Sequence, residues 1–117
     1  MTYVDGFVTP VAAGDREVYR AYAQKVSPVF IEYGALQLVD CWGDDVPHGK
    51  VTDFYKAVNA TETENVVFSW VVWPSKAVRD EAYPKIMNDP RAMPNADMPF
   101  DGKRLIWGGF DVISDVS

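Results

Sequence analysis

The stretch from Val66 to Asp80, VVFSWVVWPSKAVRD, constrains the fold of this chain more than any other. Its first eight residues are β-branched or aromatic apart from Ser69, which is the composition of a strand. Apolar and polar residues do not alternate, so both faces of this strand must be covered. Pro74 has no N–H to donate and ends the strand, and Ser75 is suited to cap a helix. The stretch therefore predicts a buried strand followed directly by a helix.

The rest of the chain predicts three more strands and one more helix. The expected elements are strands at 3–11, 36–43, 66–73 and 103–113, and helices at 16–33 and 75–88. The first strand is expected to end at Pro10, and Pro28 is expected to bend the first helix before Gly34 ends it. The apolar stripe of that helix is expected to run through Val18, Tyr22, Val26, Phe30 and Tyr33.

The sequence makes a separate prediction for each of three further segments. The segment 51–59 fits either a strand or a helix, and an extended conformation is preferred. The segment 91–102 is expected to be a loop with turns at Met93-Pro94, Met98-Pro99 and Asp101-Gly102. The pair Gly108-Gly109 indicates a bulge or a close backbone approach within the last strand.

The predicted order β-α-β-β-α-β is that of the α+β, ferredoxin-like fold, in which two helices cover one face of an antiparallel sheet. A chain of 117 residues forms a single domain of this kind, spanning residues 1–117. Because the strands are apolar on both faces and two helices cover one, a second sheet is needed for the other face. The simplest source is an identical subunit, so the sequence predicts a homodimer.

Charge and composition exclude several classes of partner. The net charge of −6 makes binding to nucleic acid or to an anionic membrane unfavourable. The apolar run in 66–73 is too short to span a bilayer. The single Cys41 fits a reducing compartment, and the N-terminus lacks the pattern of a signal peptide. We therefore expect a cytoplasmic protein.

Four segments, taken together, resemble one family. They are the start YVDGFVTPV, the loop GDDVPHGKVTDF, the central VVFSWVVWPSKAVRD and the end PFDGKRLIWGGFDV. They resemble the YbaA-like family of uncharacterised bacterial proteins, within the dimeric α/β-barrel superfamily. The resemblance implies a barrel built from two subunits and brings no established activity, because the superfamily includes cofactor-free monooxygenases, haem-degrading enzymes, isomerases and proteins without known chemistry.

The haem-degrading branch of that superfamily provides a test. Its members resemble one another in using an Asn, a Trp and a helix-borne His that ligates iron. Trp70 stands on a suitable strand, but the helix expected at 75–88 contains no His, and His48 lies in a loop. The resemblance to this branch therefore fails at the ligand, and no haem is expected.

Three carboxylates lie in the middle of predicted strands, where charged residues are disfavoured: Asp5, Asp40 and Asp111. The first and last strands are neighbours in a ferredoxin-like sheet, so Asp5 and Asp111 are placed where they would share a proton and act as general acid or base. The alternative is that each carboxylate is paired with Arg, Lys or a Tyr hydroxyl in the structure.

A possible anion site begins the second helix. Ser75, Lys76 and Arg79 stand in or next to its first turn, where free N–H groups and the helix dipole favour negative charge. These residues are candidates for binding a carboxylate or phosphate. The alternative is a solvated helix start in which Lys76 pairs with Asp80 four residues later.

Aromatic residues of the strands form a third candidate group, suited to a flat organic ligand: Phe7, Trp42, Phe68, Trp70, Trp73 and Trp107. The alternative for all of them is core or interface packing. His48 beside Asp44 and Asp45 is not a metal signature, and Cys41 has no His at catalytic spacing. No metal or other cofactor is expected.

Three classes of function remain open. The first is a noncatalytic dimer that binds a small molecule inside the barrel. The second is a cofactor-free isomerase or oxygenase that uses Asp5, Asp40 or Asp111 as acid or base. The third is a protein-interaction module. A closed, wet pocket with unpaired carboxylates favours the enzyme, and a pocket whose polar groups are all paired favours simple binding. A filled barrel with an exposed apolar patch favours the interaction module.

Overall fold

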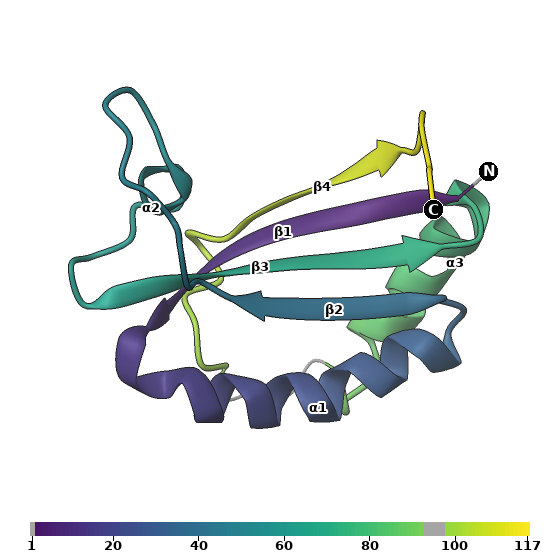
Figure 1. The fold of residues 1–117 in the computed structure, drawn as a ribbon. Helices are drawn as coiled ribbons and strands as arrows, with labels where there is room; N and C mark the ends of the chain where they lie inside the picture. Colours follow the sequence, from purple (N-terminus) through teal and green to yellow (C-terminus); the bar gives the residue numbers. More distant parts are fainter. Residues whose placement is uncertain (1, 93–97) are drawn as a thin grey trace.

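A computed structural model describes residues 2–92 and 98–117 of the chain, and Figure 1 shows its elements. They are β1 (Tyr3–Ala12), a 3-10 turn (Ala13–Asp15), α1 (Arg16–Glu32), β2 (Gln37–Trp42), α2 (Phe54–Ala57), β3 (Glu64–Trp73), α3 (Lys76–Met87) and β4 (Ile106–Asp111). The predicted turn at Met93-Pro94 lies outside the described residues. Among the described residues, no helix is both long and apolar enough to cross a membrane.

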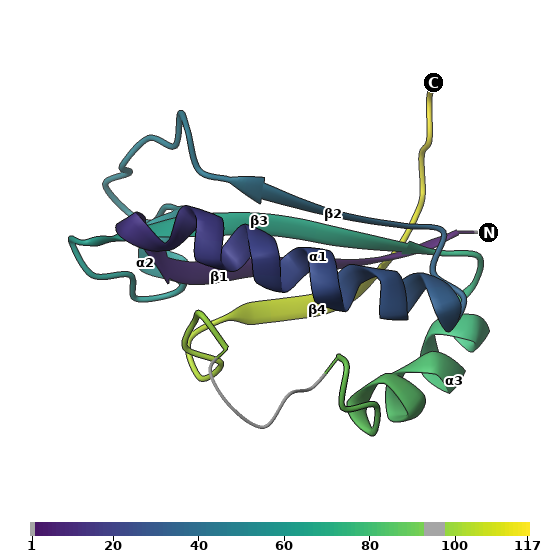
Figure 2. The ribbon, with the colours of Figure 1, turned by 90° about the horizontal axis from the view of Figure 1, so that it is seen from below.

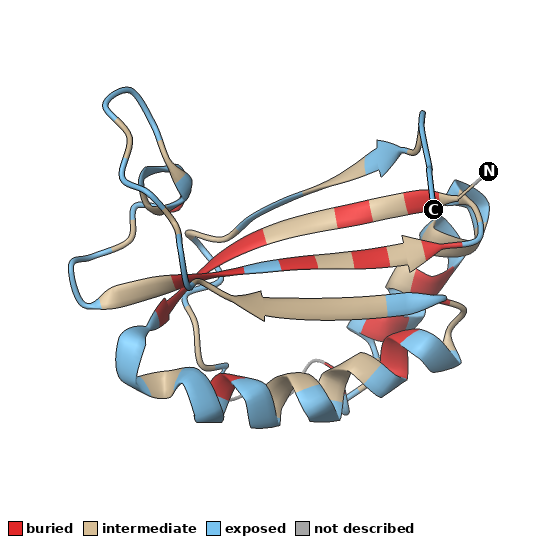
Figure 3. Ribbon diagram, viewed as in Figure 1, coloured by how far each residue is buried: buried red, intermediate tan, exposed pale blue. Residues whose placement is uncertain are grey.

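The four strands form one antiparallel sheet in the order β2-β3-β1-β4. The central strands β1 and β3 pair over ten residues and carry most of the buried positions, whereas the edge strands β2 and β4 are more exposed (Figure 3). This confirms the predicted α+β, ferredoxin-like arrangement, with the stretch VVFSWVVW as a central strand.

The strand β1 does not end at Pro10, as the sequence predicts, but continues to Ala12. Its pairing with β4 stops at Val8, whereas its pairing with β3 continues to the end. Beyond Val8 one side of β1 is therefore an edge, and a proline that lacks an N–H is tolerated there.

The helices α1 and α3 cover one face of the sheet (Figure 2). The core between them contains Tyr3, Val71 and Trp73 from the sheet, Val29 and Phe30 from α1, and Ala82 and Ile86 from α3. Tyr19 is buried on α1, whereas Val18, predicted to lie on the buried stripe, is exposed. Gly34 ends α1 with φ of 115°, a conformation that favours glycine, so this predicted helix end is confirmed.

The other face of the sheet is covered at one end alone. The segment 51–59, for which an extended conformation is preferred from the sequence, instead forms the short helix α2, which Asp53 caps by accepting from the N–H of Lys56. Val58, with the neighbouring Val46 and Tyr55, packs over Val8 and Val66. The remainder of this face, which we call the uncovered face, carries Val39, Phe68, Trp70, Ile106 and Phe110. Apart from the contact of Phe68 with Phe54 on α2, no helix of the described residues covers it.

The last strand is shorter than predicted and begins at Ile106. Its register with β1 is continuous, so the glycine pair makes no bulge. The predicted close approach is present, since a Cβ added at Gly109 would lie 2.5 Å from the hydroxyl of Tyr3. On the uncovered face, the ring of Phe110 lies against Gly6 and Gly108, which face each other across the two strands.

Candidate functional site

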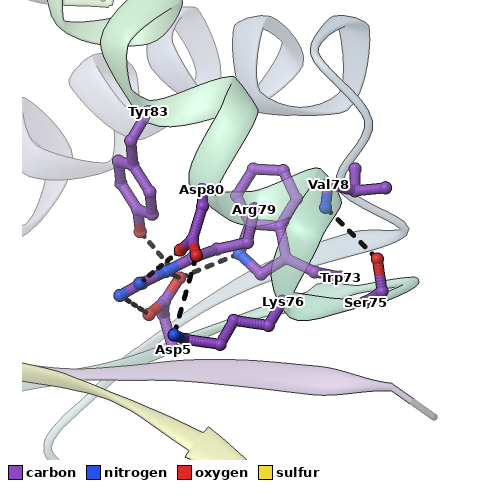
Figure 4. A network of polar contacts seen from close by, with 8 residues as sticks. All are labelled: Asp5, Trp73, Ser75, Lys76, Val78, Arg79, Asp80 and Tyr83. Carbon is purple, nitrogen blue, oxygen red and sulfur yellow. Dashed lines mark hydrogen bonds and ion pairs between the residues drawn. The ribbon is translucent and has the colours of Figure 1, made fainter.

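Asp5 of β1 is fully buried and is bound by side chains from β3 and α3 (Figure 4). Its Oδ1 accepts a hydrogen bond from Nη2 of Arg79 at 2.8 Å. Its Oδ2 accepts from Nε1 of Trp73 and from the hydroxyl of Tyr83, both at 2.8 Å, and from Nε of Arg79 at 3.3 Å. Burial raises the pKa of Tyr83, and its hydrogen bond to Asp5 raises that pKa further. A buried carboxylate needs such partners, and here the chain itself supplies all of them.

The cations predicted to bind an anion at the start of α3 are already paired with carboxylates (Figure 4). Arg79 points under the sheet to Asp5 and also contacts Asp80 at 3.0 Å. Lys76 pairs with Asp80 at 3.7 Å, which is the i,i+4 pair expected from the sequence. The hydroxyl of Ser75 accepts from the N–H of Val78 and so serves as the helix cap. These contacts are those of the solvated helix start rather than of an open anion site.

Asp111 does not meet Asp5. The two strands are neighbours as predicted, but Asp111 lies opposite Tyr3, whereas Asp5 lies opposite Gly109. Asp111 is exposed at the end of β4, and Asp5 is enclosed by its own partners. The predicted sharing of a proton between these two carboxylates is therefore wrong, because the register separates them.

Asp40 differs from both. It lies on β2, opposite Ser69 of β3, and is half-buried. Its Oδ1 accepts hydrogen bonds from the hydroxyl of Ser69 at 2.6 Å and from the hydroxyl of Tyr19 on α1 at 3.4 Å. Burial raises the pKa of Tyr19, and the charge of Asp40 raises it further, so this phenol stays a neutral donor. The polar cluster Tyr19–Asp40–Ser69 thus connects α1 to the edge strand β2 and to the central strand β3.

Asp40 also opens onto a groove of about 740 Å³ between α1 and β2, which we call the α1–β2 groove. One wall is a single face of α1, with Arg16, Arg20, Ala23, Ser27 and Ile31 at spacings of three and four residues. The opposite wall is made by alternate residues of β2, namely Leu38, Asp40 and Trp42. Most of the lining is apolar, so Asp40 is a charged group within an otherwise mainly apolar wall.

The predicted aromatic group does not form one pocket, because the sheet divides it. Register places Trp42, Trp73 and Trp107 on the face that carries the helices. Trp73 is buried in the core, Trp42 lines the α1–β2 groove, and Trp107 stacks on Phe7 near the other edge. Phe68 and Trp70 lie two residues apart on β3 and point to the opposite face of the sheet.

The register of β3 with β1 shows on which face of the sheet Phe68 and Trp70 lie. Phe68 pairs with Val8, and Trp70 pairs with Gly6, so both even-numbered side chains belong to the uncovered face. Their rings are in contact, with centroids 5.8 Å apart. They are therefore neighbours on the uncovered face, one pleat repeat apart, and the sheet separates both from Trp42 and Trp107.

The loop before α2 is stabilised by Asp53. Its carboxylate accepts from the N–H groups of Lys56 and Gly49, and these bonds lower the pKa of Asp53. His48 is exposed, stacks on Tyr55 and lies 3.8 Å from Asp53. Within residues 2–92 and 98–117, no three His, Cys, Asp or Glu side chains are grouped so as to hold a metal ion.

Comparison with known proteins assigns the chain to a family. Residues 2–102 match the family described as "Protein of unknown function (DUF1428)". The chain is 57% identical over 116 residues to the protein "Uncharacterized protein YbaA" of Escherichia coli K12, with 98% of this chain and 99% of that protein covered. The chain belongs to the DUF1428 family. This confirms the family resemblance predicted from the sequence.

Two solved structures of low sequence identity share the fold of this chain. A dimeric ferredoxin-like protein from an uncultured marine organism matches with a TM-score of 0.59 at 11% identity, over 99% of this chain and 100% of that one. Rv0793 from Mycobacterium tuberculosis matches with a TM-score of 0.53 at 12% identity, over the whole of both chains. At these identities the matches show the fold alone, so the function of this DUF1428 member has to be argued from its own geometry.

Sequence reasoning identified Asp40 but not its surroundings. Ser69 was a usable signal, because it is the single polar residue in a strand that is otherwise apolar, and such a residue needs a partner. Tyr19 adjoins Val18 of the predicted apolar stripe, but nothing in the sequence indicates that its hydroxyl contacts β2. The contribution of Arg16 and Arg20 depends on how α1 lies along β2, which the sequence does not specify.

Proposed function

We propose that this protein is a homodimer in which each subunit binds a small organic molecule in its α1–β2 groove, on the helix-bearing face of the sheet rather than inside the barrel as expected from the sequence. The observation that supports binding most directly is the state of Asp40. Both of its hydrogen bonds end on Oδ1, and Oδ2 accepts none from the described residues. No buried side-chain oxygen in the described part of the chain lacks a partner, so Oδ2 must be in contact with solvent.

The two strand carboxylates illustrate the difference between a structural and a binding role. Asp5 is inaccessible, and both of its oxygens are bound by side chains of the core. Asp40 has one oxygen fixed by Ser69 and Tyr19 and the other directed to solvent in an apolar groove. A ligand donor placed there would make a hydrogen bond to a charged acceptor, which contributes about 1.5–3 kcal/mol. The surrounding apolar wall would bury the body of the same ligand.

The uncovered face supports the dimer. Phe68 and Ile106 are each 45% exposed and Phe110 is 60% exposed, and all three lie on this face with Trp70 and Val39. Pairing two such faces would bury more than about 1,000 Å², which is the range of stable interfaces. The α1–β2 groove lies on the opposite face of the sheet, so a dimer of this kind leaves it open. The fold relative from a marine organism is itself described as dimeric.

A cofactor-free enzyme is the second candidate, and the same residue supports it. A carboxylate with one fixed and one free oxygen is held in position to accept a proton from a bound molecule. Asp40 is therefore the proposed base in that case, with Asp5 and Asp111 excluded by their positions.

The remaining prediction, a cytoplasmic location, is consistent with the unpaired Cys41 on β2.

Blocking the groove tests the proposal. Gln24 lines the groove, whereas the adjacent Lys25 is an exposed residue of α1 outside its lining. A library of small organic molecules is screened by thermal shift against wild type, Gln24→Trp and Lys25→Trp. Binding in the groove predicts that ligands raise the melting temperature of wild type and Lys25→Trp but not of Gln24→Trp. Equal shifts in all three proteins would place the ligands elsewhere and refute the groove as the site.

A further inference from the structure

We infer that the α1–β2 groove selects amphiphilic acids that have an anionic head, a hydroxyl or ammonium group close to that head, and an apolar tail. This inference rests on the proposed function and specifies its ligand. It follows from the order of charges along the groove. The helix α1 runs antiparallel to β2, with its N-terminal end beside the C-terminal end of the strand (Figures 1 and 2).

The end of the groove at Trp42 is cationic. Arg16 and Arg20 line this end, one helical turn apart on the same face of α1. Neither forms an ion pair within 4.0 Å with any carboxylate of residues 2–92 and 98–117, although the net charge of the chain is −6. Two arginines at one end of the groove, without a carboxylate partner among the described residues, favour an anionic head group.

The middle of the groove carries the opposite charge. Asp40 lies two residues before Trp42 on the same face of β2, and its Oδ2 is free to accept. A ligand whose head lies at Arg16 and Arg20 therefore places its next few atoms at this carboxylate. A plain hydrocarbon there would leave the charge of Asp40 without water or a partner, which is costly. A hydroxyl or ammonium group would instead donate to Oδ2.

The end of the groove at Leu38 is apolar. Leu38 faces Pro28 and Ile31 in the last turns of α1, and it packs against the core cluster that contains Val29. Ile31 is 47% exposed, which is apolar surface that a tail would remove from water. From Trp42 to Leu38 the strand advances about 13 Å, since alternate residues are about 7 Å apart. This length fits a medium-chain acid.

Three probes separate the parts of this inference: 3-hydroxyoctanoate, octanoate, and the methyl ester of 3-hydroxyoctanoate. Dissociation constants are measured by isothermal titration calorimetry, and the place of binding is followed through the amide NMR signals of Ala23 and Trp42. We expect 3-hydroxyoctanoate to bind about 10-fold more tightly than octanoate, because it alone donates to Asp40. The ester should bind about 5-fold more weakly than its acid, because it lacks the charge for Arg16 and Arg20.

Two variants and one control assign these preferences to residues. Asp40→Asn should reduce the preference for the hydroxyl group, and it should not weaken octanoate, because a charge that repels the anionic head is removed. The double variant Arg16→Gln/Arg20→Gln should remove the preference for the acid over its ester. Lys25→Gln removes a charge of the same helix outside the groove and should change neither preference.

The outcomes distinguish this inference from the proposed function. If the three probes shift the groove signals with equal affinity, the ligand class is wrong, whereas the groove remains a binding site. The same conclusion follows if the probes are silent but other library compounds shift these signals. If no compound shifts the signals of Ala23 and Trp42, both the ligand class and the proposed function fail.

Discussion

The guanidinium of Arg79 on α3 binds the carboxylate of Asp5 on β1 at 2.8 Å, across 74 residues of sequence. The ring of Tyr83 lies 4.9 Å from the guanidinium carbon, and Tyr3 and Trp107 lie at 5.5 and 5.8 Å, so three aromatic rings surround the cation. The pair therefore holds α3 against the central strand β1. It has a structural role, which leaves Asp40 as the strand carboxylate that a ligand can reach.

Removing one partner of this pair should be strongly destabilising. In Arg79→Met, Asp5 stays buried without its cation, and breaking such pairs costs about 3–5 kcal/mol. The measurement is urea-induced unfolding at one fixed protein concentration. Lys76→Met is the matched control on the same helix, because it breaks only the exposed pair with Asp80 and should cost less than about 0.5 kcal/mol. Equal losses in both variants would contradict a structural role for the Asp5–Arg79 pair.

The close approach of β4 to β1 should make Gly109 irreplaceable. A Cβ at this position would lie within 3.0 Å of three atoms of the buried Tyr3 side chain. We expect Gly109→Ala to lower the free energy of unfolding by about 1–3 kcal/mol, because the tyrosine ring has to move. Gly14→Ala is the control, since nothing lies within 4 Å of its Cβ position, and it should change stability by less than about 0.5 kcal/mol. A harmless Gly109→Ala would show that the strands are farther apart than described.

The ion pair between Glu64 and Arg104 predicts a stability contribution that depends on pH. Two hydrogen bonds from Arg104, at 2.7 and 2.8 Å, are the main reason that the pKa of Glu64 is lowered from 4.5 to about 2. Because the folded-state pKa is the lower one, the stabilisation is fully present above pH 4.5 and is lost as the pH falls towards 2.

The variant Glu64→Gln tests this dependence. At pH 7 it should be less stable than wild type by about 1 kcal/mol, allowing for solvent screening at this partly exposed site. The difference should shrink below pH 4.5 and vanish near pH 2, as measured by denaturant unfolding along a pH series. A difference that stays constant over the whole series would rule out the ion pair as its origin.

The uncovered face predicts how the chain assembles. Light scattering at low micromolar concentration should give a mass near twice 13.1 kDa for the wild-type protein. Phe68→Glu places a charge beside Trp70 on the uncovered face and should shift this mass towards 13.1 kDa. Val51→Glu, at a residue that is 94% exposed, should leave the dimer intact. A wild-type protein that is monomeric and unfolds cooperatively would contradict assembly through this face.

The sheet was predictable from the sequence because its determinants are local. The run from Val66 to Trp73 and the helix start at Ser75 are set by β-branched residues, a proline and a capping hydroxyl, and each was found where expected. The short helix α2 was not predicted. It contains four residues, too few for a hydrophobic repeat, and it is held by the cap at Asp53 and by packing of Val58 on the sheet.

The candidate site was predictable only in part, because its properties depend on contacts across the fold. The pattern of Asp5, Asp40 and Asp111 is the same in sequence, since each is a carboxylate within an apolar strand. Register and packing then separate them into a buried ion pair, a groove residue and an exposed strand end. The aromatic residues were misgrouped for a similar reason, because residues of different strands share a face only when the register is known.

Mapping bound compounds by NMR tests the central claim most directly. Amide signals of the wild-type protein are recorded with and without each compound that raises its melting temperature. The account predicts that the largest shifts fall on Ala23, Leu38, Asp40 and Trp42, and that Asp40→Asn reduces them for compounds that carry a hydroxyl or ammonium group. Shifts concentrated instead on Val39, Phe68 and Trp70 would place the ligand on the uncovered face and contradict the α1–β2 groove as the functional site.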